Sequence, residues 1–384
     1  MKTLFNSFSF FFLISYKICI WGQNYSIGST SYSLPDPSRP GRNVQVKLYY
    51  PAQSVGINAP WESGTFPIIS FGHGFGMFYT TYQNIWEYFV PKGYVIAMVD
   101  MENAIFPFPS HENFGLDIRF TAKELLSRSQ QLISDPIYGK LSGKVAFMGH
   151  SMGGGSSVLG ASHEPGFPDA VIGLSAAETN PSAVSAAQQV TIPFLMIAGE
   201  KDLVTPPPQH QIPIYNALAS DCKFYAEIKG GIHCYYGLPD VACDFGETSS
   251  GSQPGISRAQ QQQYTYDLAL PFLEWHLKSQ SSSPFFALLS DSRYFFNYNC
   301  LNTTTGLAQD SPMALVFYQG GFFYQGEKLG NLHIYDIHGK LINRYTVNGS
   351  AWLPVPENLN SSMVLAEFIG SDEKWIRKLL ILKN

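Results

Sequence analysis

Charge is scarce in this 384-residue chain. Asp, Glu, Lys and Arg make up 14% of the residues, and 29 acidic against 24 basic side chains give a formal net charge of −5. Soluble domains usually carry roughly 25% charged residues. The chain has no basic run, which excludes the positive surface that nucleic-acid binding requires. Hydrophobic residues reach 45%, so an intrinsically disordered chain is also excluded.

Long apolar runs are absent as well. No segment has the ~18 consecutive apolar residues of a membrane-spanning helix. A shorter apolar stretch, residues 8–14, follows Lys2 and precedes Gly22. This pattern predicts a signal peptide over residues 1–22 and a protein that is secreted or displayed at the cell surface. A buried N-terminal strand or helix is the alternative.

Only four cysteines remain beyond the predicted signal peptide, and an exported chain can oxidise them. Cys234 and Cys243 share one loop and are candidates for a disulfide. A predicted strand separates Cys222 from Cys234 by more than a disulfide allows, at ~3.3 Å per residue. Nothing in the sequence pairs Cys222 with Cys300. No cysteine or histidine spacing typical of zinc is present, so we expect no metal and no cofactor.

Short apolar segments alternate with helix-like segments through most of the chain. The predicted strands are Val44–Tyr50, Phe66–Phe71, Tyr94–Val99, Val145–Met148, Ala170–Leu174, Phe194–Ala198 and Lys223–Ile228. The predicted helices are Thr81–Val90, Asp117–Leu132, Gly154–Ser162, Gln209–Leu218 and Gln260–Leu277. Such alternation predicts an α/β fold in which helices flank a mostly parallel sheet.

The composition changes near the C-terminus. Ser279–Pro284 has the composition of a linker, and the aromatic segment after it, up to Asn302, is expected to pack against the α/β layer. The predicted strands farther on are Leu315–Phe323, Asn331–Tyr335, Lys340–Val347, Ala351–Val355, Met363–Ile369 and Trp375–Leu382. We therefore expect a catalytic domain over residues 23–302 and a small all-β, sandwich-like domain over residues 310–384.

A Gly-x-Ser-x-Gly sequence, Gly149–Gly153, lies between the predicted strand Val145–Met148 and a helix rich in small residues. This strand–turn–helix setting is typical of a nucleophile elbow, in which glycines permit a sharp turn that presents the serine. Ser151 is therefore the predicted nucleophile. A serine hydroxyl needs a base to activate it, and the base needs an orienting acid.

Two polar residues follow later strands in the order that this chemistry requires. Asp202 comes after Phe194–Ala198, and His233 comes after Lys223–Ile228, so both lie where ligands bind in open α/β sheets. Glu200 is the alternative acid. The backbone N–H of Met152 and that of Phe75, with Gly74 as the alternative to Phe75, are the predicted oxyanion donors.

These motifs together resemble bacterial cutinases and polyester hydrolases, including PET hydrolases, of the α/β-hydrolase superfamily. The resemblance rests on Gly149–Gly155, Gly72–Gly76, Gly199–Asp202 and Gly230–His233. Chlorophyllase-like and dienelactone-hydrolase-like esterases are more distantly similar. The resemblance implies the triad Ser151, Asp202 and His233, with Phe75 and Met152 forming the oxyanion hole.

The chain departs from those families at the substrate site. Polyester hydrolases usually carry a substrate-stacking Trp after the strand that follows the elbow helix, and Ala177 takes that position here. Phe75, His150 and Phe106 are further candidates for substrate contact. The roughly twenty residues between Ala170–Leu174 and Phe194–Ala198 are too few for a cap domain of several helices, so we expect an open site.

The C-terminal segment resembles the sorting domain of the type IX secretion system. The resemblance rests on residues 334–340 and on the basic strand at residues 377–383, and it implies the type IX secretion machinery as a partner. A carbohydrate-binding module is the alternative. The expected function is hydrolysis of bulky or polymeric esters by a monomer; the alternatives are an esterase for small soluble esters and a non-catalytic surface-binding protein.

Overall fold

A computed structural model describes residues 24–300 and, beyond them, 314–318, 321–325, 329–336, 340–348, 351–354, 363–370 and 374–380. The chain divides into two units, Met1–Asn302 and Thr303–Asn384. The predicted signal peptide lies outside the described residues. Within the part of the chain that the structure describes, no helix has the length and apolar character to cross a membrane.

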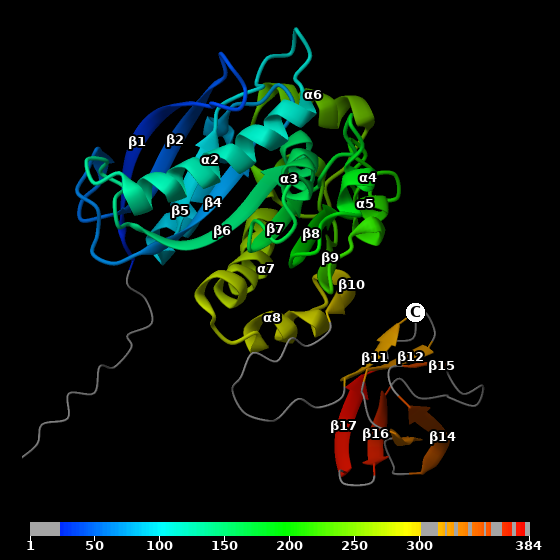
Figure 1. The fold of residues 1–384 in the computed structure, drawn as a ribbon. Coiled ribbons are helices and arrows are strands. Elements are labelled where there is room, and N and C mark those ends of the chain that lie inside the picture. Colours follow the sequence, from blue (N-terminus) through cyan, green and yellow to red (C-terminus); the bar gives the residue numbers. More distant parts are fainter. Residues whose placement is uncertain are drawn as a thin grey trace, which may run out of the picture. The chain divides into compact units, whose positions relative to one another are not determined.

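The first unit is built on one ten-stranded sheet with the strand order β10-β9-β8-β7-β6-β4-β5-β2-β1-β3 (Figure 1). Its strands are β1 (Ser26–Pro35), β2 (Asn43–Ala52), β3 (Gly56–Ile57), β4 (Phe66–Gly72), β5 (Val95–Val99), β6 (Leu141–His150), β7 (Ala170–Leu174), β8 (Phe194–Gly199), β9 (Cys222–Ile228) and β10 (Tyr294–Cys300). The central pairs from β5 through β9 are parallel, whereas β1–β2, β2–β5 and β9–β10 are antiparallel. The predicted mostly parallel sheet is confirmed.

Helices cover both faces of this sheet. They are α1 (Gln83–Phe89), α2 (His111–Gln131), α3 (Met152–Ser162), α4 (Ala183–Ala187), α5 (Gln211–Ala217), α6 (Val241–Ser250), α7 (Arg258–Lys278) and α8 (Ser283–Ala287). Figure 1 shows α2 and α3 lying across one face. These two helices share a hydrophobic core with α4 and α5, while α1, α7 and α8 contribute to a second core on the other face.

The alternation of side chains along each strand explains the two cores. In β6, Val145 and Phe147 belong to the first core, and Ala146 and Met148 belong to the second. All four are buried, because successive side chains of a strand point to opposite faces and both faces here carry helices. This double burial is why the central strands are continuous apolar runs in the sequence.

Several boundaries differ from the predictions. Helix α2 begins at His111 rather than Asp117, because the Ser110 side chain accepts a hydrogen bond from the Asn113 N–H and caps the helix. The polar strand β1 and the helix α6 were not predicted. The Ser279–Pro284 segment lies within the first unit; its first four residues join α7 to α8, and its last two begin α8.

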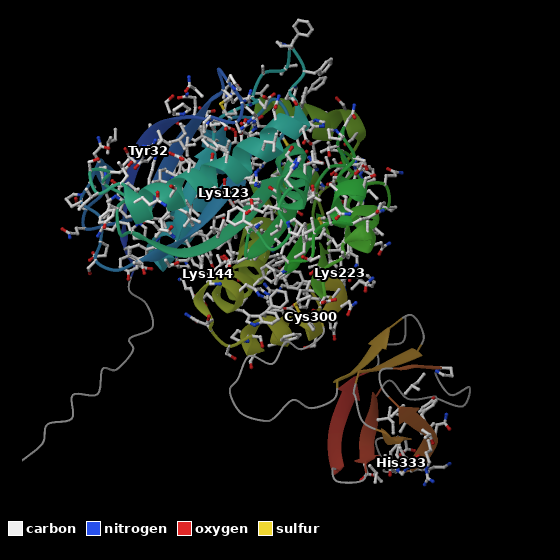
Figure 2. All side chains as sticks on the ribbon, viewed as in Figure 1. Tyr32, Lys123, Lys144, Lys223, Cys300 and His333 are labelled. Carbon is white, nitrogen blue, oxygen red and sulfur yellow. A yellow bond between two sulfur atoms is a disulfide. The ribbon has the colours of Figure 1, made fainter. Side chains whose placement is uncertain are left out.

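The aromatic segment after Pro284 packs against the α/β layer, as predicted. Phe285 of α8 is fully buried in the second core, and β10 extends the sheet beside β9. The register of that pair places Cys300 opposite Cys222, and the two form a disulfide (Figure 2). The sequence left this pairing open because the strand β10 was not predicted.

The described part of the second unit consists of β-strands. The strands are β11 (Ala314–Tyr318), β12 (Gly321–Gln325), β13 (Leu329–Tyr335), β14 (Leu341–Asn348), β15 (Ala351–Pro354), β16 (Met363–Gly370) and β17 (Lys374–Leu380). They form two antiparallel sheets, β11-β12-β15 and β14-β13-β16-β17. The single strand predicted over Leu315–Phe323 is wrong, because the chain reverses there and forms the β11–β12 hairpin.

Candidate active site

Ser151 stands at the turn between β6 and α3 with a left-handed backbone (φ 54°, ψ −118°). A non-glycine residue adopts this conformation only at a cost, so the surroundings must hold it. Its N–H donates to the Leu174 carbonyl at 2.9 Å, and its own carbonyl accepts from the Ala177 N–H at 2.9 Å. The strand–turn–helix geometry expected of an elbow is therefore present, and the Ser151 residue is 9% exposed.

Two glycines make the turn possible. A β-carbon at Gly149 would lie 2.3 Å from the Gly153 carbonyl oxygen, and one at Gly153 would lie 2.1 Å from the Gly72 carbonyl oxygen. Neither position has room for any side chain, because the atoms in the way are backbone. The close approach of Gly153 to Gly72 also places the start of α3 against the glycine-rich turn after β4.

Asp202 and His233 form a buried pair. The His233 Nδ1 lies 2.8 Å from Asp202 Oδ2, and the other carboxylate oxygen of Asp202 accepts the N–H groups of Val204 at 2.9 Å and Thr205 at 2.8 Å. Burial alone raises the pKa of Asp202, but the charge and hydrogen bond of His233 and the Thr205 N–H outweigh burial and lower it. Asp202 is thus held as a carboxylate beside the imidazole.

Glu200 does not reach this pair. Its carboxylate accepts the Gly230 N–H at 2.7 Å, and the residue is exposed. The geometry therefore favours Asp202 over Glu200 as the partner of His233.

Hydrogen bonding in the glycine-rich turn favours the Phe75 N–H over the Gly74 N–H as the candidate oxyanion donor. The Gly74 N–H donates to the Tyr82 hydroxyl at 2.9 Å and is already occupied. Phe75, the next residue, is 41% exposed. Met152 is the first residue of α3, and the first N–H groups of a helix have no partner within the helix. The Gly72–Gly153 contact joins the turn that carries Phe75 to the start of α3, where Met152 lies.

The candidate substrate residues have different environments. His150 is 0% exposed, with Nδ1 2.7 Å from the Tyr82 hydroxyl and Nε2 3.0 Å from the His233 carbonyl oxygen. Burial, followed by the charge of His233, holds the pKa of His150 well below its ordinary value. A fully buried ring has no surface to offer a substrate. Ala177 is partly exposed, and Phe106 is 85% exposed.

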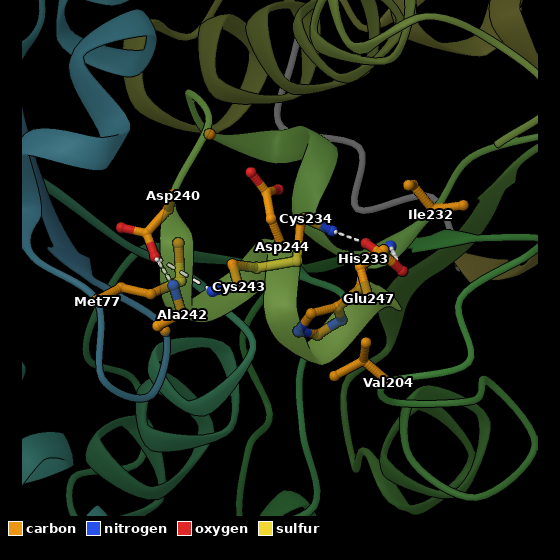
Figure 3. The surroundings of a disulfide bond; sticks show 12 residues. Met77, Val204, Ile232, His233, Cys234, Asp240, Ala242, Cys243, Asp244 and Glu247 are labelled. Carbon is orange, nitrogen blue, oxygen red and sulfur yellow. Dashed lines mark hydrogen bonds between the residues drawn. A yellow bond between two sulfur atoms is a disulfide. The ribbon is translucent and has the colours of Figure 1, made fainter. Parts of the chain in front are cut away.

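The loop after His233 contains a disulfide and a buried acid (Figure 3). Cys234 is joined to Cys243 of α6, which confirms the candidate pairing. Glu247, also on α6 and buried, accepts the Cys234 N–H at 2.6 Å and the His233 N–H at 3.4 Å. Helix α6 thus holds the backbone on which His233 is carried.

Several residues of the site were not predicted from sequence. They are Thr205, whose hydroxyl lies 3.0 Å from both Asp202 Oδ2 and His233 Nδ1, together with Tyr82 and Glu247. Only Thr205 had a sequence signal, its place in the loop that carries Asp202. Among the described residues, no group of three or more His, Cys, Asp or Glu side chains could hold a metal ion.

Comparison with known proteins places these features in a family. The chain is 26% identical to "Cutinase 1" of Thermobifida cellulosilytica over 185 residues, 48% of this chain and 66% of that protein. It is also 26% identical to "Bis(hydroxyethyl) terephthalate hydrolase" of Streptomyces coelicolor over 215 residues, 54% of this chain and 60% of that protein. The chain therefore spans less than two thirds of the length of these relatives.

A family match covers Ser151, Asp202 and His233 together. Residues 46–242 match a family described as "PET hydrolase-like". This range is more than half of the chain, and it contains the parallel core of the sheet from β4 to β9. On the strength of that match and of the fold that carries it, the chain belongs to the PET hydrolase-like family.

Proposed function

We propose that this protein is a serine ester hydrolase that works through an acyl-enzyme, with Ser151 as nucleophile, His233 as base and Asp202 as orienting acid. The observation that carries the proposal is the strained serine at the strand–helix turn together with a buried Asp202–His233 pair held at 2.8 Å. Family membership supports it, because the matched range includes all three residues.

The reaction follows from the roles of these groups. Ser151 Oγ attacks the ester carbonyl carbon while His233 Nε2 takes the hydroxyl proton, and Asp202 stabilises the imidazolium that forms. The carbonyl oxygen becomes an oxyanion that accepts the N–H groups of Phe75 and Met152; removing one such donor typically costs about 3 kcal/mol of transition-state stabilisation. His233 then protonates the leaving alkoxide, and a water activated by the same histidine releases the acid and regenerates Ser151.

We propose bulky or polymeric esters as the substrates. Exposed apolar side chains from the glycine-rich turn and the residues just after it, the loop between β5 and α2, the loop that carries Asp202, and α6 make up what we call the apolar collar: Phe75, Phe78, Ile105, Phe106, Phe108, Leu203, Val241 and Phe245. Contacts connect the glycine-rich turn to the loop between β5 and α2 and to α6. The Phe75 and Phe108 rings lie 6.3 Å apart, and a β-carbon at Gly76 would lie 3.1 Å from Ile105 and 3.9 Å from Ala242.

An exposed apolar surface of this kind is typical of interaction sites. It suits an insoluble ester better than a small soluble one, which would not reach across several loops. The name of the cutinase relatives supports the same substrate class. Ala177 provides no aromatic ring for stacking, so we expect aromatic polyesters to be poorer substrates than aliphatic ones.

Ester hydrolysis by the Ser151→Ala variant tests the catalytic proposal. We expect the rate on a soluble para-nitrophenyl ester to fall about 10⁴-fold or more with the fold intact. A para-nitrophenyl series of increasing chain length, followed by polyester nanoparticles, then tests the substrate class. A preference for short soluble esters and no hydrolysis of nanoparticles would favour the small-ester alternative.

We further propose that the protein is exported and that its second unit is a type IX secretion sorting domain. The two disulfides of the first unit suit an oxidising compartment. In the second unit, within the segment that carries the resemblance, the Asp336 N–H donates to the Lys340 carbonyl at 2.9 Å.

A further inference from the structure

A continuous buried chain of hydrogen bonds links the glycine-rich turn to the His233 loop through two residues that the proposed mechanism does not use. The Gly74 N–H donates to the Tyr82 hydroxyl at 2.9 Å, and that hydroxyl lies 2.7 Å from His150 Nδ1. On its other side, His150 Nε2 lies 3.0 Å from the His233 carbonyl oxygen. Tyr82 and His150 are both fully buried, so water cannot replace either of them.

The two ends of the chain determine the direction of every hydrogen bond. A backbone N–H can only donate, and a backbone carbonyl can only accept. His150 must therefore carry its proton on Nε2 and donate it to His233. Nδ1 is then an acceptor, and the Tyr82 hydroxyl, which accepts from Gly74, donates its single proton there. Met77 Sδ, 3.3 Å from the same hydroxyl, is a weaker acceptor.

A neutral His150 satisfies this whole arrangement. Each of the polar groups in the chain has a partner, and none carries a charge. Burial holds the pKa of His150 well below its ordinary value, which agrees with a neutral ring at neutral pH. Satisfied buried networks of this kind fix one geometry, because breaking any member leaves a desolvated group without a partner.

The chain connects the three segments on which the reaction depends. Gly74 directly precedes Phe75, His150 directly precedes Ser151, and the accepting carbonyl belongs to His233 itself. The N–H of His233 faces Glu247 at 3.4 Å, so its backbone is held from both sides. These segments are far apart in sequence, and the side chains of Tyr82 and His150 connect all three by hydrogen bonds in the interior.

We propose that Tyr82 and His150 are positioning residues, which hold the Phe75 turn and the His233 loop in the correct place relative to Ser151. The inference rests on the proposed function of those three residues. It assigns His150 no contact with substrate, since the ring has no exposed surface. Loss of either residue should therefore lower kcat and leave KM nearly unchanged.

The experiment compares Tyr82→Phe with Tyr94→Phe on a soluble para-nitrophenyl ester. Tyr94 is an equally buried tyrosine of the second core, and its hydroxyl makes no hydrogen bond within the described residues. We expect Tyr82→Phe to lower kcat roughly 10- to 100-fold with KM within about twofold, because two buried groups lose their partner. Tyr94→Phe should keep the wild-type kcat.

A second pair of variants tests His150. His150→Gln keeps an N–H that can donate to the His233 carbonyl, whereas His150→Leu keeps none, so the glutamine variant should retain the higher kcat. The low-field proton resonance shared by His233 and Asp202 should shift or broaden in His150→Leu and in Tyr82→Phe. It should be unchanged in Tyr94→Phe.

The outcomes separate this inference from the proposed function. An inactive wild-type protein, or a Ser151→Ala variant with full activity, would overturn the proposed function itself. An active, Ser151-dependent enzyme in which Tyr82→Phe matches Tyr94→Phe would overturn the positioning role alone. So would a raised KM at unchanged kcat, because it would place His150 in substrate binding. If Tyr82→Phe does not fold, the two His150 variants decide: equal losses of kcat in His150→Gln and His150→Leu would overturn the inference.

Discussion

Asp202 shows how one residue's surroundings select its role. Its carboxylate faces His233, whereas the carboxylate of Glu200, two residues earlier, binds the Gly230 N–H. We expect Asp202→Asn to lower kcat about 10⁴-fold, because the imidazole loses the acceptor that sets its tautomer. Glu200→Gln is the matched control and should retain most of the activity. If Glu200→Gln lowers kcat on a soluble ester more than Asp202→Asn does, the orienting acid is misassigned.

Ala177 offers a test of substrate choice at a single position. Its N–H is fixed by the Ser151 carbonyl, and its side chain is partly exposed next to the elbow. Ala177→Trp should improve the hydrolysis of an aromatic polyester relative to a short aliphatic ester. Stacking of this kind contributes ~0.5–1.5 kcal/mol, so the gain should be at most about tenfold. Equal losses on both substrates would mean that the tryptophan disturbs packing.

His276 should make the protein sensitive to acid. The ring packs against Phe272 and Trp275, and burial lowers its pKa to about 4. The unfolded histidine, with a pKa of about 6.5, takes up a proton at a higher pH than the folded one. Stability is therefore lost as the pH falls from ~6.5 toward 4, with a slope of at most ~1.4 kcal/mol per pH unit for this residue.

Replacement by a ring that cannot be protonated tests this effect. His276→Phe should reduce the loss of unfolding free energy between pH 7 and pH 5, measured by denaturant titration at each pH. Part of the loss should remain, because the buried His73 and His150 also have lowered pKa values. An unchanged pH dependence in the variant would mean that His276 is protonated in the folded protein.

At the scale of elements, the two disulfides should have different effects. The Cys234–Cys243 bridge closes a short loop next to His233, with a sequence separation of 9. The Cys222–Cys300 bridge joins β9 to the edge strand β10 and closes a loop with a sequence separation of 78. Chain entropy alone gives about 2.7 kcal/mol for the short loop and about 4.5 kcal/mol for the long one. Loss of the Cys222–Cys300 bridge should therefore affect stability more, and loss of the Cys234–Cys243 bridge should affect activity more.

Paired alanine substitutions test this contrast. Loss of Cys222–Cys300 should lower the melting temperature more, with kcat unchanged at temperatures where the protein stays folded. Loss of Cys234–Cys243 should lower kcat more, because α6 then holds the His233 loop only through Glu247 and neighbouring contacts. Melting curves and kcat on a soluble ester measure both quantities. A larger loss of kcat in the Cys222–Cys300 variant would contradict the argument.

The sequence predicted the parts of the fold that follow from local patterns. The apolar central strands, the strand–turn–helix around Ser151 and the positions of Asp202 and His233 were visible, because burial on both faces gives continuous apolar runs and these polar residues follow the ends of such runs. The strand β1, rich in Ser, Thr and Tyr, and the helix α6 were missed because they have no such pattern. Tyr82 and Glu247 were missed for another reason: their partners are distant in sequence, and only tertiary packing brings them together.

At the scale of the whole molecule, the two units should be separable. The proposed catalytic groups all lie in Met1–Asn302, and so does the strand β10 with Cys300. A chain that ends at Asn302 should therefore fold and hydrolyse a soluble ester at the wild-type rate. Loss of that activity would show that the second unit is needed for the fold of the first.

The same truncation tests the role of the second unit in its host. If that unit is a sorting domain, the shortened protein should reach the periplasm and remain there, as immunoblots of periplasm and medium would show. If secretion is unchanged and adsorption to polymer or glycan is weaker, the second unit is a binding module and the sorting assignment is wrong.

The Cys222–Cys300 disulfide has a mechanical consequence. The chain leaves the first unit two residues after Cys300, so a pull on the second unit is transmitted to the edge strand β10. An edge strand held by backbone hydrogen bonds alone can be peeled away one residue at a time. Here the force meets a covalent link to β9 at the last residue of the strand. A pull on the C-terminal part of the chain should therefore load this covalent link before it can separate β10 from β9.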